Sequence, residues 1–255
     1  MTAPGYGTEN APIISLKHVS CARAVAKRAQ RRVARDLHEH LLAAYRPRAR
    51  TDAKIILDDI SFDVHSGERV GLIGRNGAGK SSLLFVLSGT LPLSGGALTV
   101  RGTTQSLMNA SIGLKNEATG IENIRLNAYR LGMQGEAVDD MVASITEFSE
   151  LGDALGDPVV MYSAGMRLRL TFAIVTAIQP DILLMDEWIG AGDRHFTGKA
   201  NARLHDVLDR SRALIIASHN DRLLTQLCSR GLVLHEGKLV FDGPINEALA
   251  FYAAA

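Results

Sequence analysis

Cysteine is scarce in this sequence: only Cys21 and Cys228 occur, far apart and with no C-x-x-C pair or histidine cluster beside them. They are expected to be ordinary thiols in a reducing cytoplasm. No stretch approaches 18 uncharged apolar residues, so no membrane span is predicted, and a role at a membrane would need another chain as anchor. Excess charge is missing too, because 28 Lys and Arg residues face 27 Asp and Glu residues, which leaves no overall field to attract nucleic acid.

What the sequence does contain is a complete phosphate-loop pattern. Residues 74–81 read G-R-N-G-A-G-K-S, which fits G-x-x-x-x-G-K-[ST] at every fixed position. The short, mostly apolar stretch 69–73 before it is typical of a buried parallel strand, and residues 82–87 after it are typical of a helix. A glycine-rich turn that binds nothing is the alternative, but this order favours nucleotide binding. The predicted contacts are Gly74, Arg75, Asn76, Gly77, Ala78, Gly79, Lys80, Ser81 and Ser82.

Each residue type in this loop has a physical role. Gly74, Gly77 and Gly79 allow backbone N–H groups to turn inward around an anion, and the following helix directs the positive end of its dipole at the same point. The ammonium group of Lys80 is expected to reach the β- and γ-phosphates. The hydroxyl of Ser81 is expected to bind Mg²⁺.

Two carboxylates and a histidine follow further apolar runs. Residues 181–185 predict a buried parallel strand, and Asp186 and Glu187 then emerge at its carboxyl end, where open α/β sheets bind ligands. Asp186 is predicted to hold Mg²⁺ through water, and Glu187 to orient or deprotonate the attacking water. His219 follows the predicted strand 214–218 and can hydrogen-bond a γ-phosphate. The alternatives are two acids that only cap a strand and a structural histidine.

Residues 23–50 form an unusual basic segment of the chain. It holds nine Lys and Arg residues against only Asp36 and Glu39, and apolar residues recur at every fourth position from Val25 to Leu41. This pattern predicts a basic amphipathic helix with a narrow apolar stripe. The stripe could dock the helix on its own domain, or the basic face could meet anionic lipid head groups or a membrane partner.

The rest of the pattern predicts alternating strands and helices. Short strands are expected at 13–19, 55–57, 60–64 and 93–100, helices within 120–151 and 168–178, a hairpin of 231–234 with 238–241, and a short closing helix.

The motifs follow one another in this order: a phosphate loop, S-x-G at a helix start, an apolar run with D-E, and a strand ending in His. This order resembles the nucleotide-binding domain of ABC ATPases over residues 13–245. This resemblance implies an α/β fold: a P-loop NTPase core, mostly parallel sheet flanked by helices, with an antiparallel β subdomain and a helical signature subdomain. Residues 1–255 would be one domain, with 13–111 and 171–245 as core and β subdomain, 112–170 as helical subdomain, and 23–50 as basic insertion.

The same resemblance implies a head-to-tail homodimer with two ATP molecules at its interface. Ser163, Ala164 and Gly165 of one copy would contact the γ-phosphate held by the other copy. Ala191, Gly192 and Asp193 would lie at the dimer interface. Mg²⁺ would be bound by Ser81, Asp186 and an amide after the preceding strand, for which Asn109 is the candidate and Gln105 lies early.

Three longer segments look like the ATPase subunits that export bacterial O-antigen, capsule, wall teichoic acid and galactan. They are Y-S-A-G-M-R-L-R-L-T-F-A (162–173), T-G-I-E-N-I (119–124) and D-E-W-I-G-A-G-D (186–193). This resemblance implies a membrane permease as partner, a lipid-linked polysaccharide as cargo, no nucleic acid, and a peripheral position on the cytoplasmic face of the inner membrane.

The sequence departs from the family pattern at two places. Ala164 replaces a glycine of the usual signature L-S-G-G-Q. No aromatic residue follows the first strand to stack on adenine, where Arg23 stands instead; Arg23 could lie over the ring, or the base could be held loosely.

Two other classes of protein share part of the pattern. A soluble ABC ATPase that acts on nucleic acid or ribosomes would usually carry coiled-coil insertions or tandem ATPase domains, which this sequence lacks. A metabolic P-loop kinase would need no S-x-G signature. The sequence therefore favours an ATPase that drives export.

Overall fold

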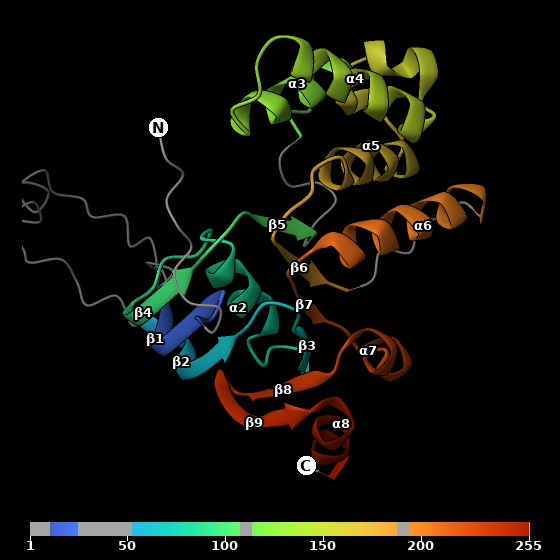
Figure 1. Cartoon of the computed structure of the whole chain (residues 1–255). Helices are drawn as coiled ribbons and strands as arrows, with labels where there is room; N and C mark the ends of the chain where they lie inside the picture. The colour runs from blue at the N-terminus through green and yellow to red at the C-terminus, as the bar shows by residue number, and fades with distance from the viewer. Residues whose placement is uncertain (1–10, 25–52, 108–113, 188–193, 255) are drawn as a thin grey trace, which may run out of the picture.

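The computed structural model describes residues 11–24, 53–107, 114–187 and 194–254. Within them two β-sheets and a set of helices are arranged around two apolar cores (Figure 1). No helix in these ranges is both long and apolar enough to cross a bilayer.

The larger sheet has six strands in the order β5-β6-β7-β3-β8-β9, and β9 alone runs antiparallel to its neighbour. Its central strands are almost continuous apolar runs because helices or the second sheet cover both faces, as expected for parallel strands. The strands are β3 (Arg69–Ile73), β5 (Thr104–Leu107), β6 (Ile182–Asp186), β7 (Ala213–Ala217), β8 (Arg230–His235) and β9 (Lys238–Pro244).

The smaller sheet is antiparallel, in the order β2-β1-β4, with β1 (Ile14–Ala24), β2 (Ala53–Val64) and β4 (Gly95–Val100). The two short strands predicted at 55–57 and 60–64 are wrong, because one continuous strand contains both. An irregularity at Asp59, which has φ +56°, interrupts its pairing with β1 and accounts for the break in the sequence pattern. β1 also continues to Ala24, so the insertion predicted from residue 23 starts later; residues 25–52 lie outside the described residues.

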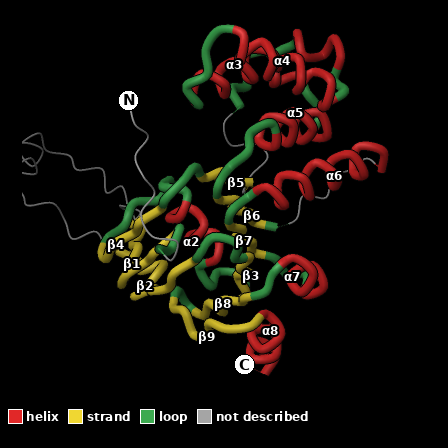
Figure 2. The backbone as a smooth tube through the Cα atoms, in the orientation of Figure 1, coloured by secondary structure: helices red, strands yellow, loops and turns green. Residues whose placement is uncertain are grey.

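The helices lie in different positions relative to the two sheets (Figure 2). α2 (Lys80–Leu87) lies beside the sheets, while α3 (Gly120–Arg130), α4 (Glu136–Ser149) and α5 (Ala164–Thr176) form a separate layer. Between that layer and the large sheet lies α6 (Arg194–Arg210), and α7 (Asp221–Leu227) and α8 (Ile245–Ala254) flank β3 and β8. Short 3₁₀ turns at Gly152–Gly156 and Val159–Met161 lead into α5.

Each face of the large sheet packs on a different core. One core joins the sheet to α2 and the antiparallel sheet through residues such as Leu72, Leu84 and Ile215. The other joins it to α4, α5 and α6, where Phe148, Phe172 and Phe196 lie 5.7–6.2 Å apart between ring centroids. The predicted α/β class with an antiparallel sheet and a helical layer is confirmed.

Candidate nucleotide-binding site

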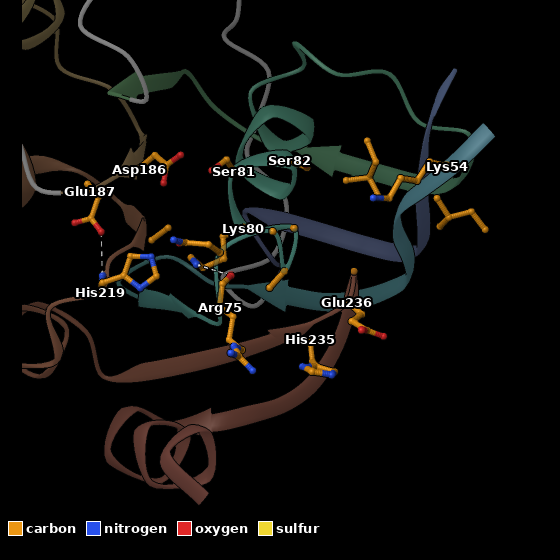
Figure 3. Close-up of a pocket in the computed structure, with 18 residues that line it drawn as sticks. Lys54, Arg75, Lys80, Ser81, Ser82, Asp186, Glu187, His219, His235 and Glu236 are labelled. Carbon is orange, nitrogen blue, oxygen red and sulfur yellow. Dashed lines mark hydrogen bonds between the residues drawn. The ribbon is translucent and has the colours of Figure 1, made fainter. Parts of the chain in front are cut away.

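A pocket of about 1480 Å³ opens where β3, β6 and β7 end and α2 begins (Figure 3). Residues from the phosphate loop, the two acids after β6 and the histidine after β7 line it together. The lining residues are Lys54, Ile55, Ile56, Arg75, Asn76, Gly77, Ala78, Gly79, Lys80, Ser81, Ser82, Asp186, Glu187, Ala217, His219, His235, Glu236 and Gly237.

The phosphate loop connects β3 directly to α2, and its glycines occupy positions that other residues would not tolerate. Gly74, Gly77 and Gly79 have φ values of +152°, +83° and +110°. A side chain at Gly74 would also collide with the backbone oxygen of Leu234. Gly74 was predicted as a phosphate contact, but it does not line the pocket. Glycine is needed at this position because the loop passes close to β8 there.

The first turn of α2 is built to leave backbone amides open. Gly79 is the N-cap residue and offers no side chain to accept a hydrogen bond, and no acidic residue lies in the first turn. The unsatisfied N–H groups and the positive end of the helix dipole therefore face the pocket at one point. An anion is the ligand that this arrangement favours.

Lys80 supplies the positive charge in this part of the pocket. Its ammonium group donates hydrogen bonds to the backbone oxygens of Gly74 at 2.5 Å and Arg75 at 3.2 Å. Burial lowers the pKa of Lys80, and the nearby carboxylates of Asp186 and Glu187 raise it in part. A buried ammonium bonded to neutral carbonyls gains from a bound anion, so the electrostatics match the predicted phosphate site.

The turn between β8 and β9 supports the phosphate loop from behind. The N–H of Gly237 donates to the carbonyl of Ala78 at 2.9 Å, and the N–H of Asp58 donates to the carbonyl of Gly237 at 2.8 Å. Gly237 has φ +81°, and a Cβ there would collide with the backbone oxygen of Ile56. The hairpin turn therefore ties the antiparallel sheet to the loop.

Asp186 and Glu187 lie at the end of β6. In the pocket they stand on the side opposite Lys54 of β2 (Figure 3). Asp186 is half-buried and ends the parallel ladder with β7 opposite Ala217. Glu187 turns sharply, with φ +72°, and its carboxylate accepts hydrogen bonds from the N–H of His219 at 3.0 Å and from the hydroxyl of Ser218 at 3.2 Å. The predicted acids and histidine thus come together through β6 and β7.

The predicted Mg²⁺ ligands fit that ion in part. The hydroxyl of Ser81 and the carboxylate of Asp186 line the same pocket, and both are hard oxygen donors of the kind that Mg²⁺ prefers. No cluster of three or more His, Cys, Asp or Glu side chains suited to a metal occurs in the described parts of the chain. Such a cage is not needed, because Mg²⁺ is usually held by one or two protein oxygens, substrate phosphates and water.

The S-x-G segment does not reach this pocket. Ser163 is the N-cap of α5 and accepts the N–H of Met166 at 3.2 Å. Ser163, Ala164 and Gly165 are all exposed, and they belong to the helical layer. Their predicted role in a second copy's site stays a prediction.

Several predicted residues lie outside the described residues: Asn109, Ala191, Gly192, Asp193 and residues 25–52. Gln105 lies within β5, opposite Leu183 of β6.

The outer part of the pocket was not predicted. It is formed by residues 54–56 of β2 and by His235, Glu236 and Gly237 at the hairpin turn. Ile55 shows why this part was missed. It is an apolar residue on a strand, but it is 60% exposed and lines this part of the pocket. Alternation of apolar residues alone does not distinguish such a residue from one in the core.

Comparison with known proteins identifies the kind of protein to which this pocket belongs. Residues 57–190, which include the phosphate loop, the S-x-G segment and the two acids, match the family model described as ABC transporter. The chain belongs to the ABC transporter family.

Curated relatives show which members of the family the chain resembles. The chain is 39% identical over 196 residues to the teichoic acids export ATP-binding protein TagH of Listeria innocua, a match that covers 77% of this chain and 58% of that protein. It is 42% identical to the O-antigen export system ATP-binding protein RfbE of Yersinia enterocolitica, over 73% of this chain and 77% of that one. These ABC proteins belong to the export group that the motifs predicted, so that predicted resemblance is confirmed. The chain spans 58% of the length of this Listeria protein, and between 36% and 83% of the length of the other teichoic acid relatives.

Solved ABC structures share the fold. An ATP-binding subunit of an ABC transporter superimposes with a TM-score of 0.69 at 18% identity, covering 94% of this chain and 93% of that one. An ATP-binding cassette dimer bound to ADP and Pi superimposes with a TM-score of 0.66 at 17% identity, over 91% and 98% of the two chains.

Proposed function

We propose that this chain binds and hydrolyses ATP with Mg²⁺, and that hydrolysis drives a membrane permease that exports a lipid-linked cell-surface polysaccharide. One observation carries the enzymatic part: residues 75–82 of the phosphate loop, Asp186, Glu187 and His219 line a single pocket although they come from separate segments of the sequence. An anion cradle beside a carboxylate and a histidine is what phosphoryl transfer to water requires.

The residues divide the work by their position. The open amides of α2 and the ammonium of Lys80 bind the phosphates and offset their charge. Ser81 and Asp186 would hold Mg²⁺, which neutralises charge on the phosphates when bound. Glu187 orients the attacking water and accepts its proton, and His219, beside Glu187, hydrogen-bonds the terminal phosphate.

The proposal includes a head-to-tail dimer of two copies. Its support is that Ser163, Ala164 and Gly165 are exposed and stand apart from the pocket of their own chain. The fold neighbour that was solved as a dimer with ADP and Pi has the same architecture. In such a dimer the exposed amides at the start of α5 would face the phosphates held by the other copy.

The export part rests on the relatives. Both closely matching groups are named as ATP-binding proteins of export systems, for teichoic acids and for O-antigen. An ATP-binding subunit of this kind needs a permease to provide the path through the membrane, and the proposal includes a peripheral position for the chain at the cytoplasmic face of that membrane. The cargo class shared by these relatives is a cell-surface polysaccharide.

The test of the enzymatic proposal is Glu187→Gln, with Glu247→Gln on the exposed face of α8 as the matched control. The amide cannot accept the proton, so turnover should fall by at least about 100-fold, while ATP still binds with near-normal affinity. Phosphate release by the purified chain and ATP titration measure the two effects. Normal turnover in Glu187→Gln would remove the proposed role of this carboxylate.

The test of the export proposal is co-purification of the chain from its native membrane, followed by mass spectrometry. A permease with a lipid-linked glycan should be recovered together with the chain. Recovery of ribosomal or DNA-processing proteins in place of a permease would contradict the export function and leave ATP hydrolysis intact.

A further inference from the structure

Glu187 adopts a backbone conformation that its side chain does not favour. Its φ of +72° lies in the left-handed region, which residues with a Cβ enter at a cost. The N–H of Glu187 still donates to the carbonyl of Ala217 at 2.8 Å, so the turn begins at the last hydrogen bond between β6 and β7. The carboxylate is thereby directed along the end of β7 instead of along β6.

Ser218 receives that carboxylate. Its side chain is only 4% exposed, and its hydroxyl lies 3.2 Å from Oε2 of Glu187. The same hydroxyl oxygen accepts the N–H of Asn220 at 3.1 Å. Because Asn220 occupies the acceptor side of the oxygen, the hydroxyl hydrogen is left to point at the carboxylate.

The chain of hydrogen bonds is anchored at both ends. Asn220 is the N-cap residue of α7, and its side chain accepts the N–H of Leu223 at 3.2 Å. At the other end, Oε1 of Glu187 accepts the N–H of His219 at 3.0 Å (Figure 3). One bond to each oxygen fixes both the position and the plane of the carboxylate.

We propose that Ser218 is the positioning residue of Glu187, and that its hydroxyl holds the carboxylate in the orientation used for hydrolysis. Ser218 does not line the pocket, so it acts on the reaction only through Glu187. The inference rests on the proposed function, because it assigns a second residue to the same hydrolytic step. It extends that function by making the link between β6 and β7 a determinant of the rate.

The test is Ser218→Ala in the full chain, measured as kcat and KM for ATP. Loss of one hydrogen bond to a charged group should lower kcat by about 10-fold to 100-fold, because the carboxylate is then held at one oxygen only. KM should change by less than about 2-fold, since the residues that line the phosphate site are intact. Ser218→Thr keeps the hydroxyl and should recover most of the lost kcat.

Thr176→Val is the matched control for loss of a buried hydroxyl. Thr176 is also 4% exposed, and its hydroxyl donates to the carbonyl of Phe172 at 2.7 Å, within α5. The control should leave kcat within about 2-fold of the unmodified chain. Thermal unfolding of all three variants shows whether stability changes differ, because a merely structural role for Ser218 would lower stability without a selective loss of kcat.

The outcomes separate this inference from the proposed function. An unchanged or raised kcat in Ser218→Ala, with Glu187→Gln inactive, would overturn the positioning role and leave ATP hydrolysis intact. A fall no larger than that of Thr176→Val would overturn it as well. Full turnover in Glu187→Gln would instead remove the proposed hydrolytic step itself.

Discussion

Two helices of this molecule start next to glycine-containing motifs, and their first turns differ in what they leave open. α2 begins after Gly79, which provides no side-chain cap, and its first turn forms part of a pocket. α5 begins after Ser163, whose hydroxyl accepts the N–H of Met166, and its first turn is exposed and lines no part of that pocket. Neither first turn carries an acidic residue.

The difference shows how much of the nucleotide site one copy can build. Around α2, the loop, the hairpin turn and the ends of β6 and β7 supply a cation, open amides and a carboxylate in one place. Around α5, residues 163–165 are exposed and line no part of the pocket that the described residues form. Changes near α2 should therefore affect ATP binding by a single copy, whereas changes near α5 should affect only what two copies do together.

The largest expected effect is loss of binding in Lys80→Ala. The variant removes the ammonium that faces the phosphates, and charged hydrogen bonds of this kind account for at least about 100-fold in affinity when two or more are lost. ATP titration of the purified chain measures the change. Lys17→Ala, at an exposed position of β1, is the control and should bind normally. Equal affinity in the two variants would contradict the placement of the phosphates.

Gly165→Asp should have the next largest effect, and of a different kind. A Cβ at Gly165 would lie 3.9 Å from Oγ of Ser163, and outside its own helix no other atom of the described residues lies within 4 Å of it, so these residues leave room for the new side chain. A carboxylate facing the other copy's phosphates would repel them, so turnover should fall at least about 10-fold while binding by a single copy stays normal. Phosphate release and ATP titration separate these two effects.

Gly198→Asp is the control for Gly165→Asp, because Gly198 is also exposed on a helix with open space around it. It should leave turnover unchanged. Normal turnover in Gly165→Asp as well would contradict a site formed by the α2 start of one copy and the α5 start of the other.

Gly237→Ala should have the smallest effect and sharpen the α2 side of the comparison. The new methyl group would collide with the backbone of β2, at a residue with φ +81°. Stability should fall by about 1–3 kcal/mol, and ATP affinity by several-fold, because the hairpin turn no longer holds the carbonyl of Ala78. Chemical denaturation and ATP titration measure the two changes.

Gly132→Ala is the control that separates the cost of a left-handed backbone from the loss of the contact between the hairpin turn and the phosphate loop. Gly132 has φ +78° but nothing within 4 Å of an added Cβ, so only the cost of the left-handed backbone remains. It should lower stability by about 1 kcal/mol and leave ATP affinity unchanged. Loss of affinity in Gly132→Ala as large as that in Gly237→Ala would contradict a specific role for the hairpin turn.

Sequence patterns predicted the parts of the fold that have strong local signals. The apolar run before Gly74 became β3, the run before Asp186 became β6, and the Glu236–Gly237 turn joined β8 to β9. In each case the chemistry of the turn or the burial of a central strand dictates the residues. The phosphate-loop residues and the two acids followed from motifs with fixed spacing, and the structure places all of them except Gly74 around one pocket.

β5 and α6 were both missed, for different reasons. β5 is a short edge strand whose polar residues Thr104, Gln105 and Ser106 need no burial on both faces. α6 carries buried residues at helical spacing, namely Phe196, Ala200, Leu204, Val207 and Leu208, so its pattern could have predicted it. Ser218 belongs to no motif, and its contact with Glu187 depends on a left-handed turn that a sequence does not display.

The most direct test of the two-copy site is a structure of Glu187→Gln with ATP and Mg²⁺ bound. We expect two copies, with the phosphates of each ATP between the α2 start of one copy and Ser163 and Gly165 of the other. A structure in which residues 163–165 face away from the nucleotide of the neighbouring copy would contradict the account.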